Sequence, residues 1–162
     1  MWNPENFAHF TALIDDLLQD EKVQEMQQMP QHGKSGNCYD HSLYVAYLSF
    51  LVCRRLGLDY VAAARGGMLH DFCLCNWKEE SAGISRLWTH PHLALKNAEE
   101  RYELSQMEKD IIVKHMWPLT RPLPRYRESL VVSMADKVCA LLEMSRLYRL
   151  FKVRKNLSPA TA

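Results

Sequence analysis

Six side chains of metal-ligand type are distributed along this chain, with an adjacent histidine–aspartate pair at the centre of the set. Imidazole and carboxylate ligands without a thiolate suit first-row divalent ions such as Mn, Fe, Co, Ni and Zn. A buried polar group without a partner is costly, so an ion shared by all six is the simplest partner if helices direct them inward. The six residues are His41, His70, Asp71, His90, His115 and Asp136.

Helical periodicity gives five of these six an inward direction. Residues three or four apart share one face of a helix, so apolar neighbours at that spacing indicate a buried face. Asp71 shares a helix end with His70, and this test leaves its direction open. Gly66 and Gly67 allow another backbone or a ligand to approach closely. The apolar neighbours are Val45 and Leu48 for His41, Ala63 for His70, Ala94 and Ala98 for His90, Met107 and Ile111 for His115, and Val132 and Cys139 for Asp136.

The alternative is that each of these residues is an ordinary member of the core. A single histidine on an apolar face is more often a hydrogen-bonded core residue than a ligand, whereas an aspartate such as Asp136 needs a paired or metal-bound environment. Five helices that each carry an inward ionisable group favour one shared metal site. The same test predicts that His92 is solvated and that His9 lies at the surface, and it places His32 in a loop.

The elements expected to position these residues are all helices, and no segment reads as a β-strand. Ser105 and Glu108 form a capping-box pattern, and Gly57 is a typical helix stop. Residues 72–88 have no clear periodicity, and three prolines exclude regular helix between His115 and the last helix. The expected helices span about residues 4–28, 40–56, 59–69, 89–104, 105–115 and 128–152.

Composition excludes several classes of function. The net charge of +1 provides no bulk attraction to nucleic acid or to an anionic membrane. The most apolar stretch, residues 43–52, is about half the length needed to cross a bilayer, and no signal peptide is evident at the N-terminus. Five cysteines without a framework spacing indicate reduced, mostly buried thiols. We therefore expect a cytoplasmic protein with no membrane or nucleic-acid partner.

The ordered set of residues resembles the HD-domain superfamily of metal-dependent phosphohydrolases. The family signature H…HD…D is matched by His41, by the His70–Asp71 pair within Gly-Met-Leu-His-Asp, and by Asp136 within Met-Ala-Asp-Lys. The resemblance implies an all-α, compact single-domain bundle of about six or seven helices. It implies one HD domain over residues 1–162, with its core at about 30–145 and both terminal helices packed on that core. The chain looks closest to small standalone bacterial HD proteins with the segment His-Met-Trp-Pro-Leu, here residues 115–119.

The two additional histidines resemble the extra ligands of dinuclear HD proteins. By that resemblance one ion is held by His41, His70, Asp71 and Asp136. Asp71 bridges to a second ion, which is held by His90 and His115. The chain lacks the GYP motif that follows in HD-GYP phosphodiesterases, so cleavage of cyclic dinucleotides is not favoured. Two divalent transition-metal ions (Fe, Mn, Ni, Co or Zn) are the expected cofactors.

The expected activity is hydrolysis of a small phosphate ester or anhydride, with nucleotides as one candidate class. Two adjacent ions lower the pKa of a bridging water, so a metal-bound hydroxide would attack phosphorus, with His70 and Asp71 as the catalytic pair. Two alternatives stay open: a catalytically weak metal-containing nucleotide sensor, and an HD-type di-iron oxygenase. Phosphate oxygens beyond the metals need cationic partners. The candidates are Lys137, Arg65, Lys78 and Arg125, each of which could instead be a solvated surface residue.

Overall fold

The computed structural model describes residues 3–31, 36–73 and 84–145, and only the backbone of residues 84–87. Within these ranges the chain forms eight α-helices, one short 3-10 helix and a pair of two-residue strands, so the prediction of an all-α class is confirmed. Among the described residues, no helix is both long and apolar enough to cross a membrane. Four of the five cysteines lie in these ranges, and all four are free and buried, as expected.

The prediction of one helix over residues 4–28 is wrong, because this segment is divided into four short pieces. Asn3 caps the first helix by accepting a hydrogen bond from the amide of Glu5. The chain leaves helical geometry at Ile14, where the first break lies. A second break lies at Asp20, whose carboxylate accepts hydrogen bonds from the amides of Lys22 and Val23 and so caps a new helix. The pieces are α1 (Pro4–Leu13), α2 (Asp15–Gln19), α3 (Glu21–Glu25) and the 3-10 helix η1 (Met26–Gln28).

Two long helices follow a short antiparallel pairing that the sequence did not predict. In this pairing β1 (Pro30–Gln31) lies against β2 (Gly36–Asn37). The helix α4 (Cys38–Leu56) ends at Gly57, whose φ of 66° lies in the left-handed region that suits glycine. The helix α5 (Tyr60–Leu69) packs closely on α4, because a Cβ added at Gly67 would lie 2.9 Å from the Cα of Ala46. The close approach expected at Gly67 is therefore confirmed.

The remaining three helices contribute the other candidate ligands. The helix α6 (Ile84–Glu99) begins earlier and ends earlier than the predicted span of 89–104, and it contains Pro91 in its interior. The helix α7 (Gln106–Lys114) begins with the predicted capping box of Ser105 and Glu108. The helix α8 (Arg127–Met144) ends at the C-cap Ser145, and residues 146–152 of the predicted helix lie outside the described part of the chain.

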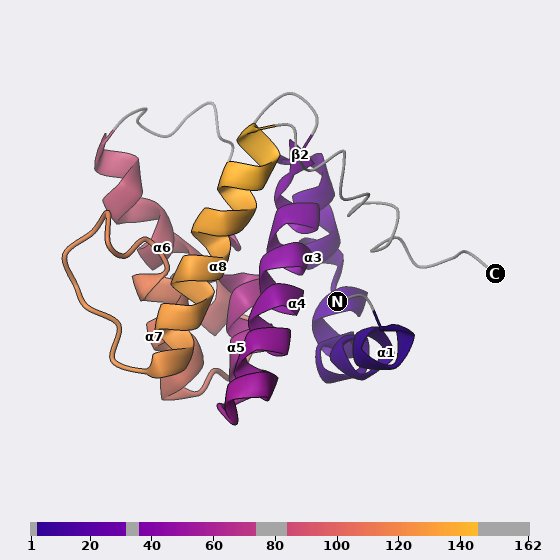
Figure 1. Cartoon of the computed structure of the whole chain (residues 1–162). Coiled ribbons are helices and arrows are strands. Elements are labelled where there is room, and N and C mark those ends of the chain that lie inside the picture. The colour runs from indigo at the N-terminus through magenta and orange to yellow at the C-terminus, as the bar shows by residue number, and fades with distance from the viewer. Residues whose placement is uncertain (1–2, 32–35, 74–83, 146–162) are drawn as a thin grey trace.

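The helices surround α4 and α5, which form the largest helix–helix contact of the fold. In Figure 1, α8 runs beside α4, α6 and α7 lie on one side of this pair, and α1 lies on the other. The larger apolar cluster joins the N-terminal helices to α4 and α5 through Phe10, Phe50 and Met68. A smaller cluster around Val45 and Ile111 joins α4, α5, α7 and α8. Both clusters include residues of α4 and α5, so this helix pair is packed on both sides.

Candidate metal centre

All six ligand-type side chains meet in one region between the helices. His41 lies in the first turn of α4, His90 lies within α6, and Asp136 lies in the middle of α8. His70 and Asp71 follow the last turn of α5, and His115 follows the last turn of α7. Five of the six are buried, and His90 is partly buried. The residues predicted from their inward-facing positions are thus brought together by five separate helices.

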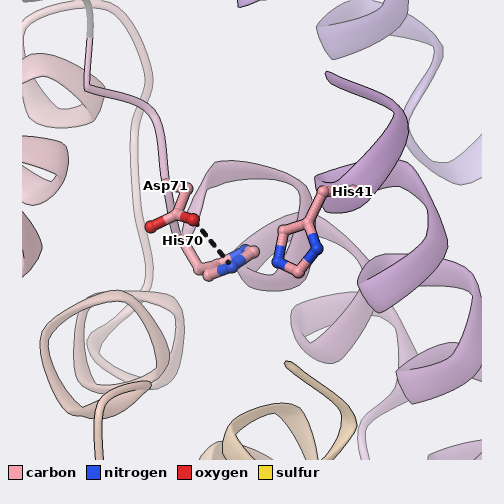
Figure 2. A group of neighbouring side chains, drawn as sticks. All are labelled: His41, His70 and Asp71. Carbon is pink, nitrogen blue, oxygen red and sulfur yellow. Dashed lines mark ion pairs between the residues drawn. The ribbon is translucent and has the colours of Figure 1, made fainter. Parts of the chain in front are cut away.

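The first group consists of His41, His70 and Asp71, whose ligand-type atoms all lie within 4.8 Å of one another. Figure 2 shows the His70 ring between the Asp71 carboxylate and the His41 ring. Nε2 of His70 lies 3.5 Å from Oδ2 of Asp71. Asp136 adjoins this group, because its Oδ1 lies 3.1 Å from Nε2 of His41 and 3.8 Å from Nε2 of His70. The three residues of this group could hold a metal ion, and Asp136 lies beside them.

The second group consists of Asp71, His90 and His115, again with ligand-type atoms within 4.8 Å of one another. Oδ1 of Asp71 lies 3.5 Å from Nε2 of His90 and 3.5 Å from Nε2 of His115. The Asp71 carboxylate therefore turns one oxygen toward His70 and the other toward His90 and His115. Asp71 is thus the residue common to both groups.

Backbone carbonyls orient two of the histidine rings. Nδ1 of His70 lies 2.7 Å from the carbonyl oxygen of Gly67, and Nδ1 of His115 lies 2.7 Å from that of Ile112. A carbonyl only accepts, so Nδ1 carries the proton in each ring and donates it. In the neutral form of either ring the lone pair is then on Nε2, which faces the cluster. Metal-binding histidines are commonly oriented in this way.

The cluster contains buried nitrogen atoms that a metal ion would satisfy. Nε2 of His70 has no hydrogen-bond partner among the described residues, although the residue is fully buried. Leaving such an atom without a partner costs about 1–3 kcal/mol. Nε2 of His90 lies only 2.8 Å from Nε2 of His115, so two ligand-type nitrogens point at the same space. The donor set and its orientation therefore fit a divalent metal ion.

The carboxylates of the cluster are held in their ionised form. Burial opposes ionisation of Asp71, but His70, His115 and His90 more than offset it and lower the pKa of this carboxyl. Burial also opposes ionisation of Asp136, whose pKa is nevertheless well below its usual range because His41 hydrogen-bonds it and His70 lies close. Both side chains thus offer the anionic oxygens that a cation requires.

The surroundings shift the pKa values of His115 and His41 in opposite directions. Burial lowers the pKa of His115 to about 3, so this ring is neutral at physiological pH, as a ligand must be. Burial also opposes the charged form of His41, but hydrogen bonds to Asp136 and Glu143 prevail and raise its pKa to about 10. Binding of a metal at His41 must therefore displace a proton from Nε2.

The side chains of Glu143 and Gln31 also contact ring or carboxylate atoms of the ligand-type residues, and neither contact was predicted. Both carboxylate oxygens of Glu143 lie 3.1 Å from Nδ1 of His41. The side-chain amide of Gln31 donates to Oδ2 of Asp71 at 2.7 Å. The position of Glu143, two helical turns after Asp136, is a signal that could have identified it. Gln31 had no such signal, because its strand was not expected.

The four predicted phosphate-binding cations have different surroundings. Nζ of Lys137 lies 3.0 Å from Oδ2 of Asp136 and donates to the carbonyl of His115, so the structure brings it to the cluster. The guanidinium of Arg65 is instead held by Asp16 at 2.7 Å and by Glu108 at 3.1 Å. The exposed Arg125 lies over the Tyr126 ring, and Lys78 lies outside the described residues. Of the four, only Lys137 has a described contact with ligand residues.

The remaining histidines are separate from this cluster. His92 is exposed, as predicted. His9 is not fully at the surface, because its ring makes edge contacts with Phe50 and Tyr60, and it is partly buried against the core. His32 lies outside the described residues.

Comparison of the chain with protein-family models, with curated proteins and with solved structures gives no match. The geometry of the cluster is therefore the basis for a functional assignment.

Proposed function

We propose that this protein is a metal-dependent phosphohydrolase that cleaves a nucleotide or another small phosphate ester or anhydride. The observation that carries the proposal is the division of the Asp71 carboxylate between two groups of imidazoles, with Oδ2 toward His70 and Oδ1 toward His90 and His115. The order of these residues along the chain, H…HD…H…H…D, resembles that of dinuclear HD-domain phosphohydrolases and supports the same reading.

In this proposal His41, His70, Asp71 and Asp136 hold one ion. Asp71, His90 and His115 hold the second, so Asp71 is shared. The donors are imidazole nitrogens and carboxylate oxygens, which suit Mn, Fe, Co, Ni or Zn. When bound, such ions lower the pKa of a water molecule and withdraw charge from the oxygens of a phosphoryl group.

The protein's own side chains supply orientation and charge. The carbonyls of Gly67 and Ile112 hold the rings of His70 and His115 with Nε2 inward, so these ligands are in place before substrate arrives. The Lys137 ammonium adjoins Asp136 and provides a positive charge beside the ligand cluster, where phosphate oxygens need one. Burial of the cluster lowers the local dielectric constant and strengthens each of these electrostatic interactions.

The test is to purify the protein with its native metal, measure its metal content and assay it on phosphomonoesters, nucleotides and dinucleotides. Asp71→Ala and the shape-conserving Asp71→Asn should both abolish hydrolysis, because each removes the shared charge. Glu100→Gln, which changes an exposed carboxylate after α6, is the matched control and should retain full activity.

Other results would identify the alternatives. If the wild type binds a nucleotide tightly but shows no turnover with any metal, the protein is a nucleotide sensor and not an enzyme. Turnover that requires iron and consumes oxygen would indicate an HD-type oxygenase. Less than about one ion per chain after reconstitution would contradict a two-metal site.

A further inference from the structure

The carboxylate of Glu143 is a charge beside the cluster that the proposed function does not use. Both of its oxygens lie 3.1 Å from Nδ1 of His41, and the two side chains are 7% and 1% exposed. Glu143 lies seven residues after Asp136 on α8, so the two carboxylates project toward α4 from nearly the same face. Nδ1 and Nε2 of His41 thus face one carboxylate each, and both carboxylates come from α8.

The partner of His41 differs in kind from the partners of His70 and His115. Those two rings donate Nδ1–H to backbone carbonyls, which are neutral and move only with their helices. The ring of His41 donates to an anionic side chain, which makes an imidazole more electron-rich and a stronger metal ligand. A carboxylate behind a ligating histidine is a recurrent arrangement in metal sites.

We propose that Glu143 is a positioning residue that orients His41 and strengthens it as a ligand of only one of the two ions. This inference rests on the proposed two-metal function. The ion concerned is the one held by His41, His70, Asp71 and Asp136. The Glu143 carboxylate accepts a hydrogen bond from Nδ1–H of His41 and so directs Nε2 of this ring toward Asp136 and the rest of the group.

The ligands of the second ion are oriented by contacts that do not involve Glu143. The carbonyl of Ile112 holds His115, and the amide of Gln31 holds Asp71. A change at Glu143 therefore acts on the first ion through His41, whereas a change at Gln31 acts on the residue that both ions share. This difference gives the inference a site-selective consequence that a general loss of stability would not produce.

The experiment is a titration of metal-stripped protein with Co²⁺, followed by calorimetry and by the visible absorption of the bound ion. Glu143→Gln keeps the shape of the side chain and removes its charge, Glu143→Ala removes the contact, and Glu100→Gln is the exposed control. We expect one of two binding steps to weaken about 10- to 100-fold in both Glu143 variants, more in Glu143→Ala, with the other step unchanged. The visible absorption of the Co²⁺ ion that binds more weakly should also shift, because its ligand His41 has lost the hydrogen bond to the Glu143 carboxylate.

Circular dichroism and thermal unfolding of the metal-stripped variants show whether the fold is intact. Equal weakening of both steps, or two unchanged steps in a folded variant, would overturn the inference while the metal site itself stands. If the wild type binds a single ion, its affinity must still fall in the Glu143 variants, and an unchanged affinity would overturn the inference. A wild-type protein that binds no Co²⁺ or other divalent ion would refute the proposed function itself and the inference with it.

Discussion

The side-chain amide of Gln31 holds the Asp71 carboxylate by a 2.7 Å hydrogen bond to Oδ2, across 40 positions of the chain. This contact links strand β1, before α4, to Asp71, two residues after the end of α5. Because Gln31 occupies Oδ2 from one side, the free rotation of the carboxylate is lost, and Oδ1 stays directed at His90 and His115. The residue shared between the two groups is thus oriented by a part of the fold outside the helical bundle.

If two ions bind as proposed, removal of this amide should weaken the binding of both, because Asp71 belongs to both groups. For Gln31→Ala we expect the affinity of each binding step to fall about 10-fold or more, measured by calorimetric titration of stripped protein. Gln28→Ala, an exposed glutamine of the same segment, is the control. A loss restricted to one step, or no loss at all, would show that Gln31 does not set the orientation of Asp71.

Chelation should lower thermal stability, because an ion that binds only the folded state stabilises that state by mass action. At an ion concentration 100 times the Kd the stabilisation is about 2.7 kcal/mol. In a chain of this length that corresponds to a fall in Tm of roughly 5–10 °C after removal of the metal. Calorimetry before and after chelation, and after readdition of Mn²⁺ or Zn²⁺, measures it. A Tm that does not respond to any ion would contradict a folded-state metal site.

Substitution at Gly67 should damage both the packing and the metal site. The added Cβ of Gly67→Ala would lie 2.9 Å from the Cα of Ala46, so α4 and α5 must separate. Overpacking of this kind costs about 1–3 kcal/mol. The carbonyl of Gly67 also orients His70, so metal affinity should fall together with stability.

Gly57→Ala provides the contrast to this change. Its Cβ would have nothing within 4 Å, and only the φ of 66° opposes it. We expect a cost of about 1–2 kcal/mol from the left-handed conformation and no change in metal affinity. Denaturant unfolding and metal titration of both variants separate the two effects. Equal metal affinities in the two variants would contradict the role of Gly67.

Acid should destabilise the N-terminal segment through Asp20. Burial raises the pKa of this carboxyl, but Arg101, Tyr102 and the amide of Lys22 prevail and lower it below its ordinary value. Between the two pKa values the unfolded chain binds more protons than the folded one, so stability is lost as the pH falls below about 4. Asp20→Asn keeps the helix cap and removes the charge. The fall in unfolding free energy from pH 5 to pH 2.5 should be shallower in this variant than in wild type, and an identical fall would refute the assignment.

Local patterns were sufficient for much of the fold. The all-α class, the capping box at Ser105, the helix stop at Gly57 and the inward faces that carry His41 and Asp136 follow from spacings of three and four residues. These features depend on interactions within one helix. The helix break at Asp20 was missed because a cap competes locally with continued helix, and its contact with Arg101 comes from 81 positions away.

Some features of the candidate site likewise follow from local sequence, and others follow only from tertiary packing. The sequence by itself determined which six residues are of ligand type and that at least five face the interior, because residue type and helical phase are local properties. Only the tertiary structure decided that the two oxygens of Asp71 face different groups, that Glu143 lies behind His41, and that Gln31 holds Asp71. These relations depend on how five helices and a hairpin pack, over separations of up to 102 positions, and no spacing within a single element encodes them.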